Sequence, residues 1–229
     1  MSMDAKARQS RVSRNPPVQA ASPPSTEGKE STDAWDLTRK KAKNCTACPL
    51  YKTGTQTIFG EGPVSAKVMM IGEQPGDRED LEGHPFVGPA GQLLDKVLME
   101  AGIDRREVYV TNAVKHFKWV PAGNRRLHKK PSAREIAACK PWLEKELDLV
   151  KPEVVVALGA TAAQALMGPA FRVTLSHGKA ITVPWAKAFV ATVHPSSILR
   201  APPETRAEQR AQFLADLKVV AKLLRSGVF

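Results

Sequence analysis

The sequence of 229 residues lacks the long apolar runs of a membrane protein and the many cysteines of a disulfide-stabilised fold. No run approaches the ~18 consecutive apolar residues of a membrane-spanning helix, and the N-terminus has no apolar signal core. Cysteine occurs only three times, too few for a disulfide framework, so metal or cluster ligation is the better interpretation of these thiols. We therefore expect a cytoplasmic protein without a membrane segment.

Acidic residues are scarce relative to basic ones. The chain has 23 Asp and Glu against 34 Lys and Arg, which gives a formal net charge of +11 and a pI near 9.7. An excess of this sign favours a polyanionic partner and does not constrain the fold. The hydrophobic share of 42%, with 6% aromatic residues, is typical of a globular protein that can bury a full core.

Residues 1–33 are rich in serine, proline, alanine and charge, without helical or strand periodicity. Such a segment cannot bury enough apolar surface to fold, so we predict a disordered basic tail followed by one domain over residues 34–229. Strands are predicted at residues 66–71, 108–110, 154–158 and 189–193, and 180–183 is a candidate edge strand. Helices are predicted from Asp33 or Asp36 to residue 43 and at 91–101, 133–150, 162–167 and 203–224, with Pro141 kinking or breaking the third.

Strands that alternate with helices predict a three-layer α/β/α sandwich with a central four-stranded parallel sheet. Ligands bind such sheets outside the carboxyl ends of the strands. Polar side chains follow three of the predicted strand ends, namely Glu73, Gln74 and Asp77, then Asn112, and then His194, Ser196 and Ser197. The sequence therefore predicts a binding site at this edge of the sheet.

A basic stretch over residues 123–131 places His128 among Arg125, Arg126, Lys129 and Lys130. Turn residues open it and a proline closes it, so it is predicted to be a loop. Four close cations repel one another unless an anion lies against them. The phosphates of a nucleic acid are the expected anion, and a loop that is simply solvated is the alternative.

Four ordered motifs resemble the iron–sulfur uracil-DNA glycosylases of family 4. They lie at residues 72–77 (GEQPGD), 85–88 (PFVG), 111–115 (TNAVK) and 194–200 (HPSSILR), within a match that runs from about residue 36 to the C-terminus. The inserted RRLH at residues 125–128 resembles the UdgX subgroup. The resemblance implies an α/β/α fold, a [4Fe–4S] cluster and excision of uracil from DNA. In the subgroup it also implies a loop histidine, here His128, that becomes covalently bound to the abasic sugar.

Three cysteines and a histidine are the expected ligands of the cluster. Cys45 and Cys48 form a ligand pair at the two ends of a turn, and Cys139 offers a third thiolate. His116 stands where the wider family has a cysteine, so the resemblance makes it the fourth ligand. By spacing alone, structural zinc bound by three cysteines and a histidine suits equally well. A His116 that lies at the surface or faces DNA, and a Cys139 that is only a buried thiol, also stay open.

The resemblance also assigns a uracil pocket. Phe86 is expected to stack on an extruded base and Asn112 to pair with its Watson–Crick edge, although each alone also suits a core aromatic or a turn residue. An amide held in one orientation would reject cytosine by leaving polar groups unpaired. His194 is the expected donor to the uracil O2 as the base leaves as an anion, and the alternative is a histidine that only caps a strand end.

The first loop lacks the carboxylate with which other uracil-DNA glycosylase families commonly orient water. Gln74 takes the comparable place, and a neutral amide cannot act as a base. Glu73 and Asp77 are the acids of this loop, either as catalytic groups or as loop caps. The neighbouring cations are expected to lower the pKa of His128 and so keep its imidazole nucleophilic. We predict that His128 traps C1′ in a single turnover, with Glu73 orienting it or taking its proton.

Ser196, Ser197 and Arg200 are expected to hold phosphates, with residues 198–199 either wedged beside the vacated base position or seated in the core. The expected partner is single-stranded DNA or DNA with a flipped-out uracil, bound by a monomer in the cytoplasm of a bacterial cell. Two other functions stay open. A glycosylase that uses water would turn over repeatedly, and a non-catalytic binder of uracil-containing or damaged DNA would fit the amide at Gln74.

Overall fold

The protein folds around one twisted sheet, and the structure, a computed structural model, describes residues 26–227. The strand order is β2-β1-β5-β7-β6. The strands are β1 (Val68–Gly72), β2 (Val108–Asn112), β5 (Val154–Leu158), β6 (Ala180–Val183) and β7 (Ala186–Thr192). The first four in spatial order are parallel, whereas β6 pairs antiparallel with β7. The four predicted parallel strands are confirmed, and the candidate edge strand at residues 180–183 is β6. A two-residue connection folds it back onto β7, so the sheet has five strands and its last pair is antiparallel.

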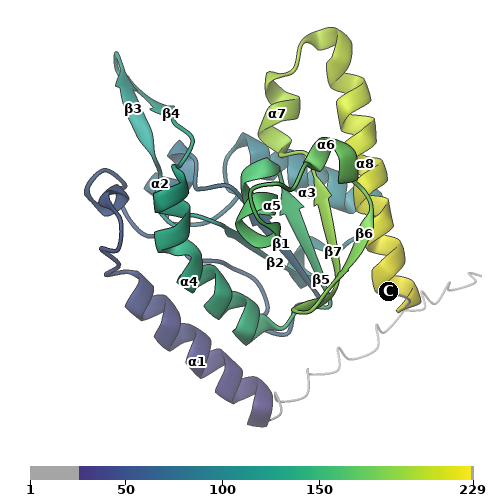
Figure 1. Cartoon of the computed structure of the whole chain (residues 1–229), viewed down its shortest axis with the longest axis horizontal. Helices are drawn as coiled ribbons and strands as arrows, with labels where there is room; N and C mark the ends of the chain where they lie inside the picture. The colour runs from purple at the N-terminus through teal and green to yellow at the C-terminus, as the bar shows by residue number, and fades with distance from the viewer. Residues whose placement is uncertain (1–25, 228–229) are drawn as a thin grey trace, which may run out of the picture.

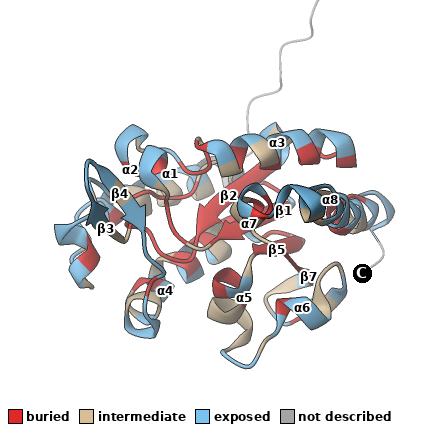
Figure 2. Cartoon of the chain, turned by 90° about the horizontal axis from the view of Figure 1, so that it is seen from above, coloured by how far each residue is buried: buried red, intermediate tan, exposed pale blue. Residues whose placement is uncertain are grey.

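Helices cover both faces of the sheet (Figure 2). One face packs against α3 (Pro89–Ala101) and α8 (Pro203–Ser226), and the other against α4 (Ala133–Val150), α5 (Ala160–Met167) and α6 (Val173–Ser176). Every residue of β1, β2 and β5 is buried, which explains their continuous apolar runs. Alternate residues enter opposite cores, so Met70 belongs to the α3–α8 side and Met69 to the α4–α5 side. The predicted three-layer arrangement is confirmed.

The helix α4 begins at a capping box. Ser132 accepts a hydrogen bond from the Glu135 N–H, and the Glu135 side chain accepts one from the Ser132 N–H. The predicted break at Pro141 is wrong, because α4 continues through this residue to Val150. Cys139 and Leu143, on either side of the proline, are buried, so tertiary packing holds the helix together despite the missing hydrogen bond.

Residues 119–128 form a hairpin that projects from the main body (Figure 1). Its strands are β3 (Trp119–Ala122) and β4 (Arg125–His128). Gly123, with a φ of 59°, and Asn124 form its two-residue turn. The prediction of a loop is thus wrong for residues 125–128: the turn residues were recognised, but not the strands that they connect. The hairpin and α7 (Pro195–Arg200) project from the same end of the molecule.

The first described helix, α1 (Thr26–Ala42), begins earlier than predicted, so residues 26–33 of the expected tail are helical. It lies along α4, and its Trp35 Nε1 donates to the Tyr109 hydroxyl at 2.8 Å. The rest of the predicted tail, residues 1–25, lies outside the described residues. Among residues 26–227, no helix is both long enough and apolar enough to cross a membrane. Short helices η1 (Pro49–Lys52), α2 (Asp77–Glu82) and η2 (Arg105–Glu107) complete the fold.

Candidate active site

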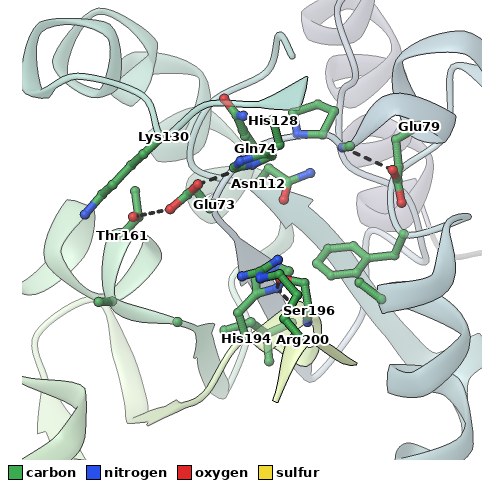
Figure 3. Close-up of a pocket in the computed structure, with 17 residues that line it drawn as sticks. Glu73, Gln74, Glu79, Asn112, His128, Lys130, Thr161, His194, Ser196 and Arg200 are labelled. Carbon is green, nitrogen blue, oxygen red and sulfur yellow. Dashed lines mark hydrogen bonds and ion pairs between the residues drawn. The ribbon is translucent and has the colours of Figure 1, made fainter. Parts of the chain in front are cut away.

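A cavity of about 310 Å³ opens at the carboxyl edge of the sheet, as the strand-end residues predicted (Figure 3). Its lining includes Glu73, Gln74, Phe86, Asn112, His128, His194, Ser196 and Arg200. These side chains come from the loop after β1, the end of β2, the loop before α3, the hairpin, and the segment from the end of β7 through α7. Five residues with predicted catalytic or phosphate-binding roles do not line it, namely Asp77, Arg125, Arg126, Lys129 and Ser197.

Asn112 and Phe86 are packed together at the end of β1 and β2. A Cβ added to Gly72 would lie 2.4 Å from Asn112 Oδ1 and 2.8 Å from Phe86 Cζ, so only glycine leaves room for both. Phe86 has a φ of 60°, which is strained for a residue with a side chain. Gly91 of α3 lies against the Phe86 carbonyl, and a Cβ there would meet its oxygen at 1.6 Å. The surrounding backbone therefore fixes the aromatic ring in one place.

His194 is held by the first turn of α7. The Ser196 N–H donates to His194 Nδ1 at 3.1 Å, and the Ser196 hydroxyl lies 2.8 Å from the same nitrogen. Because a backbone N–H can only donate, Nδ1 is the acceptor and the neutral ring carries its proton on Nε2. Burial, with the charges of Arg200 and His128, lowers the pKa of His194 to about 4. His194 is thus both a helix cap and a neutral donor, stacked at 6.3 Å on Phe86.

His128 lies against Glu73 on the opposite side of the cavity (Figure 3). His128 Nε2 is 3.4 Å from Glu73 Oε1, and the Thr161 hydroxyl donates to Glu73 Oε2. Burial lowers the pKa of His128, Glu73 opposes this, and Arg200 adds to the lowering. The predicted direction is confirmed, but the physical cause is burial and Arg200 rather than the cations of the hairpin. The arrangement is a chain of three side chains that orients one imidazole.

The Gln74 side chain supports the hairpin. Its Nε2 donates to the carbonyl oxygens of Lys118 and Lys129 at 3.1 Å each, and its Oε1 accepts from the Lys118 N–H at 3.2 Å. Lys118 and Lys129 flank the two strands, so Gln74 joins the base of the hairpin to the first loop. Only an amide can donate to two carbonyls and accept from an N–H. The amide thus has a supporting role, and the catalytic role predicted for Gln74, which also lines the cavity, stays a prediction.

Arg126 is the second support of the hairpin. Its Nε lies 2.6 Å from Asp77 Oδ1, and its Nη1 lies 2.6 Å from Oδ2 of the fully buried Asp80. The guanidinium also lies over the rings of Phe117 and Trp119, at 5.4 and 5.6 Å from their centroids. In this structure Arg126 pairs with α2 while 21% of its side chain stays exposed, so the predicted phosphate contact stays a prediction. Asp77 pairs with Arg126 and does not line the cavity, and its predicted catalytic role likewise stays a prediction.

Some of the other predicted phosphate-binding residues face the cavity or the solvent, and one is used within α7. Arg200 and Ser196 line the cavity, and Arg125 is exposed on the hairpin. The Ser197 hydroxyl instead donates to the His194 carbonyl at 2.7 Å, within the first turn of α7. Of the predicted wedge, Ile198 is 1% exposed and belongs to the core, whereas Leu199 is 40% exposed. The core alternative therefore applies to Ile198 only.

Three residues of the site were missed by sequence reasoning, namely Glu79, Asp80 and Thr161, whereas Lys130, one of the predicted phosphate-binding cations, lines the cavity. Glu79 accepts hydrogen bonds from the Gly76 and Gly88 N–H groups at 3.1 and 2.8 Å, so it joins the first loop to the start of α3. The carboxylate three residues after Gly76 was a capping signal in the sequence. The spacing of Asp77 and Asp80 on one helical face was a second signal, but nothing local indicated Thr161.

The three cysteines gather in a small separate cluster, where Cys48 and Cys139 pack with Leu50, Val114 and Trp142. Trp142 Nε1 donates to Cys45 Sγ at 3.1 Å, and the Lys115 N–H donates to Cys139 Sγ at 3.2 Å. Burial raises the pKa of Cys139 to about 11, and the nearby Cys48 and Cys45 add to the increase.

The predicted fourth ligand, His116, has a different contact. Its Nε2 lies 2.9 Å from the Thr57 hydroxyl, and burial lowers the pKa of the ring. Across residues 26–227, no three His, Cys, Asp or Glu side chains converge in a way that could hold a metal ion. The structure therefore brings the three thiols near one another, but directs the His116 ring to Thr57.

The fold, the cavity and the sequence together define the class of protein. The chain belongs to the uracil DNA glycosylase superfamily, whose model matches residues 59–218. It is similar to the type-4 uracil-DNA glycosylase of Thermotoga maritima, with 39% identity over 169 residues that cover 73% of this chain and 84% of the relative. The corresponding protein of Archaeoglobus fulgidus is 34% identical over 201 residues, covering 85% and 94%.

The similarity to a solved structure is weaker than the similarity to these relatives. The crystal structure of SMUG2 from Pedobacter heparinus covers 69% of this chain and 77% of its own, at 16% sequence identity and a TM-score of 0.49. The assignment to the superfamily therefore rests on the family match and the type-4 relatives.

Proposed function

We propose that the protein excises uracil from DNA and that His128 then bonds to C1′ of the sugar, giving a covalent protein–DNA adduct in a single turnover. This is the chemistry implied by the resemblance to the UdgX subgroup. The observation that carries the proposal is the chain from Thr161 through Glu73 to His128 on one side of the cavity, facing His194 on the other (Figure 3). The type-4 relatives support the uracil-releasing part.

Recognition of the base falls to the fixed half of the cavity. An extruded uracil stacks on Phe86, and Asn112 pairs with the alternating acceptors and donor of its Watson–Crick edge. The tight packing at Gly72 limits the freedom of both side chains. Because a fixed amide leaves polar groups unpaired against cytosine, the same contacts supply discrimination.

Departure of the base needs a donor for the developing anion. When the bond between C1′ and the base breaks, its electron pair leaves with uracil. His194 Nε2–H donates to the uracil O2, where this negative charge collects. Since burial holds the pKa of His194 near 4, the ring stays neutral and keeps one defined tautomer near neutral pH.

Capture of the sugar follows. The lone pair on the unprotonated nitrogen of the neutral His128 ring forms the bond to the electron-poor C1′. Glu73 accepts the proton of the other ring nitrogen as the ring becomes positively charged. The product is a neutral alkylated imidazole, and the released uracil anion takes up one proton. The lowered pKa of His128 keeps the ring neutral and so available as a nucleophile before the reaction.

A denaturing gel tests this proposal. Protein incubated with single-stranded DNA containing one uracil should give a band that resists SDS and heat, whereas the same oligonucleotide with thymine should not. His128→Ser should lose the band and, if Glu73 then orients water, release uracil over repeated turnovers. A resistant band from His128→Ser would show that the nucleophile is wrong. Free uracil beyond one equivalent from the wild-type protein would favour the water-using glycosylase, and salt-sensitive binding without release would favour the non-catalytic binder.

We also propose that Cys45, Cys48, Cys139 and His116 hold a [4Fe–4S] cluster. The three thiols fit, because each N–H donor from Trp142 and Lys115 would stabilise a bound thiolate. His116 would have to exchange its contact with Thr57 for the metal. When bound, the cluster would supply structural cross-linking of these segments.

Iron and acid-labile sulfide analysis, with the visible absorption spectrum, checks the cluster independently of activity. The wild-type protein should contain both elements, and Cys139→Ser should lose most of them. Zinc in place of iron and sulfide would support the structural zinc site that the spacing left open.

A further inference from the structure

A salt bridge lies completely buried behind the cavity, between Lys115 in the loop after β2 and Glu146 on α4. The two side chains are 1% and 0% exposed, and neither lines the cavity. Burying two charges is costly, and an apolar pair of similar volume is often as stable or more so. Stability alone therefore does not account for an ion pair at this position.

Glu146 accepts hydrogen bonds from several segments. Its Oε1 accepts from the Gly60 N–H at 2.7 Å and from the Tyr109 hydroxyl at 3.1 Å. Thr111 Oγ1 lies 3.0 and 2.9 Å from its two oxygens. The carboxylate thus connects α4 to β2 and to the segment before β1, in a network whose members constrain one another.

Lys115 uses all three of its ammonium protons. They go to Glu146, to Thr111 Oγ1 at 2.6 Å and to the carbonyl oxygen of Asn112 at 2.8 Å. The backbone N–H of the same lysine donates to Cys139 Sγ. One residue therefore ties the end of β2 to α4 and to the cysteine cluster.

The end of β2 needs such a support because β2 is an edge strand. In the described sheet its only ladder partner is β1, and on the outer side a single bridge joins Val110 to Glu61. Asn112, the last residue of the strand, has its carbonyl held by Lys115 while its side chain lines the cavity. The ammonium thus holds the peptide group that follows Asn112, together with the Ala113 N–H, which donates to the Gly72 carbonyl at 2.9 Å.

We propose that the Lys115–Glu146 pair positions Asn112 for uracil recognition by fixing the end of β2 behind the base pocket. The proposal rests on the proposed function, which gives Asn112 its ligand. Lys115 and Glu146 are positioning residues: they act on the base through Asn112 and touch neither base nor sugar.

The double variant Lys115→Met/Glu146→Leu tests this role, because it removes both charges and leaves none buried alone. We expect its melting temperature to fall, because the Gly60 N–H, the Tyr109 hydroxyl and the Asn112 carbonyl lose their partners, so rates are compared at temperatures where the variant is folded. Under single-turnover conditions with saturating DNA, its rate of uracil release should fall about tenfold or more, since small misplacements of a positioning group are costly. The DNA concentration that gives the half-maximal rate should not change, because the phosphate contacts remain.

Thr111 and Leu143 supply matched controls. Thr111→Val removes a hydroxyl from the same network and should lower the rate, whereas Thr111→Ser keeps the hydroxyl and should restore it. Leu143→Ala, on the same face of α4 but in the apolar core, should lower the melting temperature and leave the rate unchanged at temperatures where the protein is folded.

The outcomes separate this proposal from the one it rests on. If the wild-type protein releases no uracil, both the proposed function and the positioning role are wrong. An active wild-type protein together with a folded double variant that releases uracil equally fast overturns the positioning role alone. A rate that follows melting temperature across all variants, Leu143→Ala included, also overturns it.

Discussion

The two sides of the cavity are built in different ways. Asn112, on the base-recognition side, is 3% exposed and continues a buried strand of the central sheet. His128, on the other side, has 47% of its side chain exposed and lies at the end of a short hairpin outside that sheet. The hairpin is held mainly by side chains, from Gln74 and from the pairing of Arg126 with α2. In the proposed function, base recognition therefore falls to the central sheet and capture of the sugar to the hairpin.

This comparison predicts that variants on the two sides fail differently. Changes on the sheet side should slow the release of uracil itself. Changes on the hairpin side should leave release intact and reduce only the fraction of sugar that is captured.

The largest effect is expected from His194→Ala. It removes the proposed donor to the uracil O2, and loss of one such donor lowers rates by about 10²–10³-fold. A single-turnover assay of uracil release measures this directly, and adduct formation should slow by the same factor because it follows release. Normal uracil release with impaired adduct formation would show that His194 acts in capture of the sugar and not in departure of the base.

The sheet side of the cavity could largely be predicted from the sequence. Continuous apolar runs such as Val154–Leu158 predicted buried parallel strands, and polar residues after them predicted the cavity edge. These signals are local, because burial on both faces imposes an apolar sequence and strand ends impose polar turns. The edge strand β6 was predicted only as a candidate, because it is weakly apolar and exposed in part, as an edge strand is.

The hairpin side of the cavity could not be predicted in the same way. The strands of the hairpin are short and partly exposed, so burial leaves no periodic pattern in their sequence. Their supports come from far along the chain, since Gln74 bonds to Lys118 and Lys129, and Asp80 bonds to Arg126. Without those partners in view, the sequence suggested a missing base at Gln74 and a phosphate ligand at Arg126.

A smaller effect is expected on the pH dependence of the free energy of unfolding. This effect reports on His194, which belongs to the sheet side of the cavity. The pKa of His194 falls from 6.5 to about 4 on folding, so the unfolded chain binds more protons between these values. Stability should therefore rise with pH across this window, with a contribution from His194 of about 3 kcal/mol, because each pKa unit is worth about 1.4 kcal/mol. Urea unfolding at a series of pH values measures the slope.

His194→Asn is the matched control for that slope. Asparagine also caps helices, so it can replace the cap of α7, but it does not titrate. The variant should show a shallower dependence on pH over the same window, with the remainder due to His116 and His128, whose pKa values are also lowered. Equal slopes in the two proteins would show that burial of His194 is not what destabilises the fold in acid.

The smallest effect is expected from Gln74→Glu, which acts on the hairpin alone. A carboxylate still accepts from the Lys118 N–H but cannot donate to the two carbonyls, so the base of the hairpin should loosen. We expect capture by His128 to fall about tenfold, as for a nucleophile held less firmly.

Separate measurement of adduct and free uracil from one reaction decides this last case. Uracil release should be preserved, with uncaptured abasic DNA replacing the missing adduct. Leu127→Ala, at an exposed position of the same hairpin, should change neither quantity. If uracil release falls in parallel with capture in Gln74→Glu, the two sides of the cavity are coupled, and the hairpin contributes to base recognition as well as to capture.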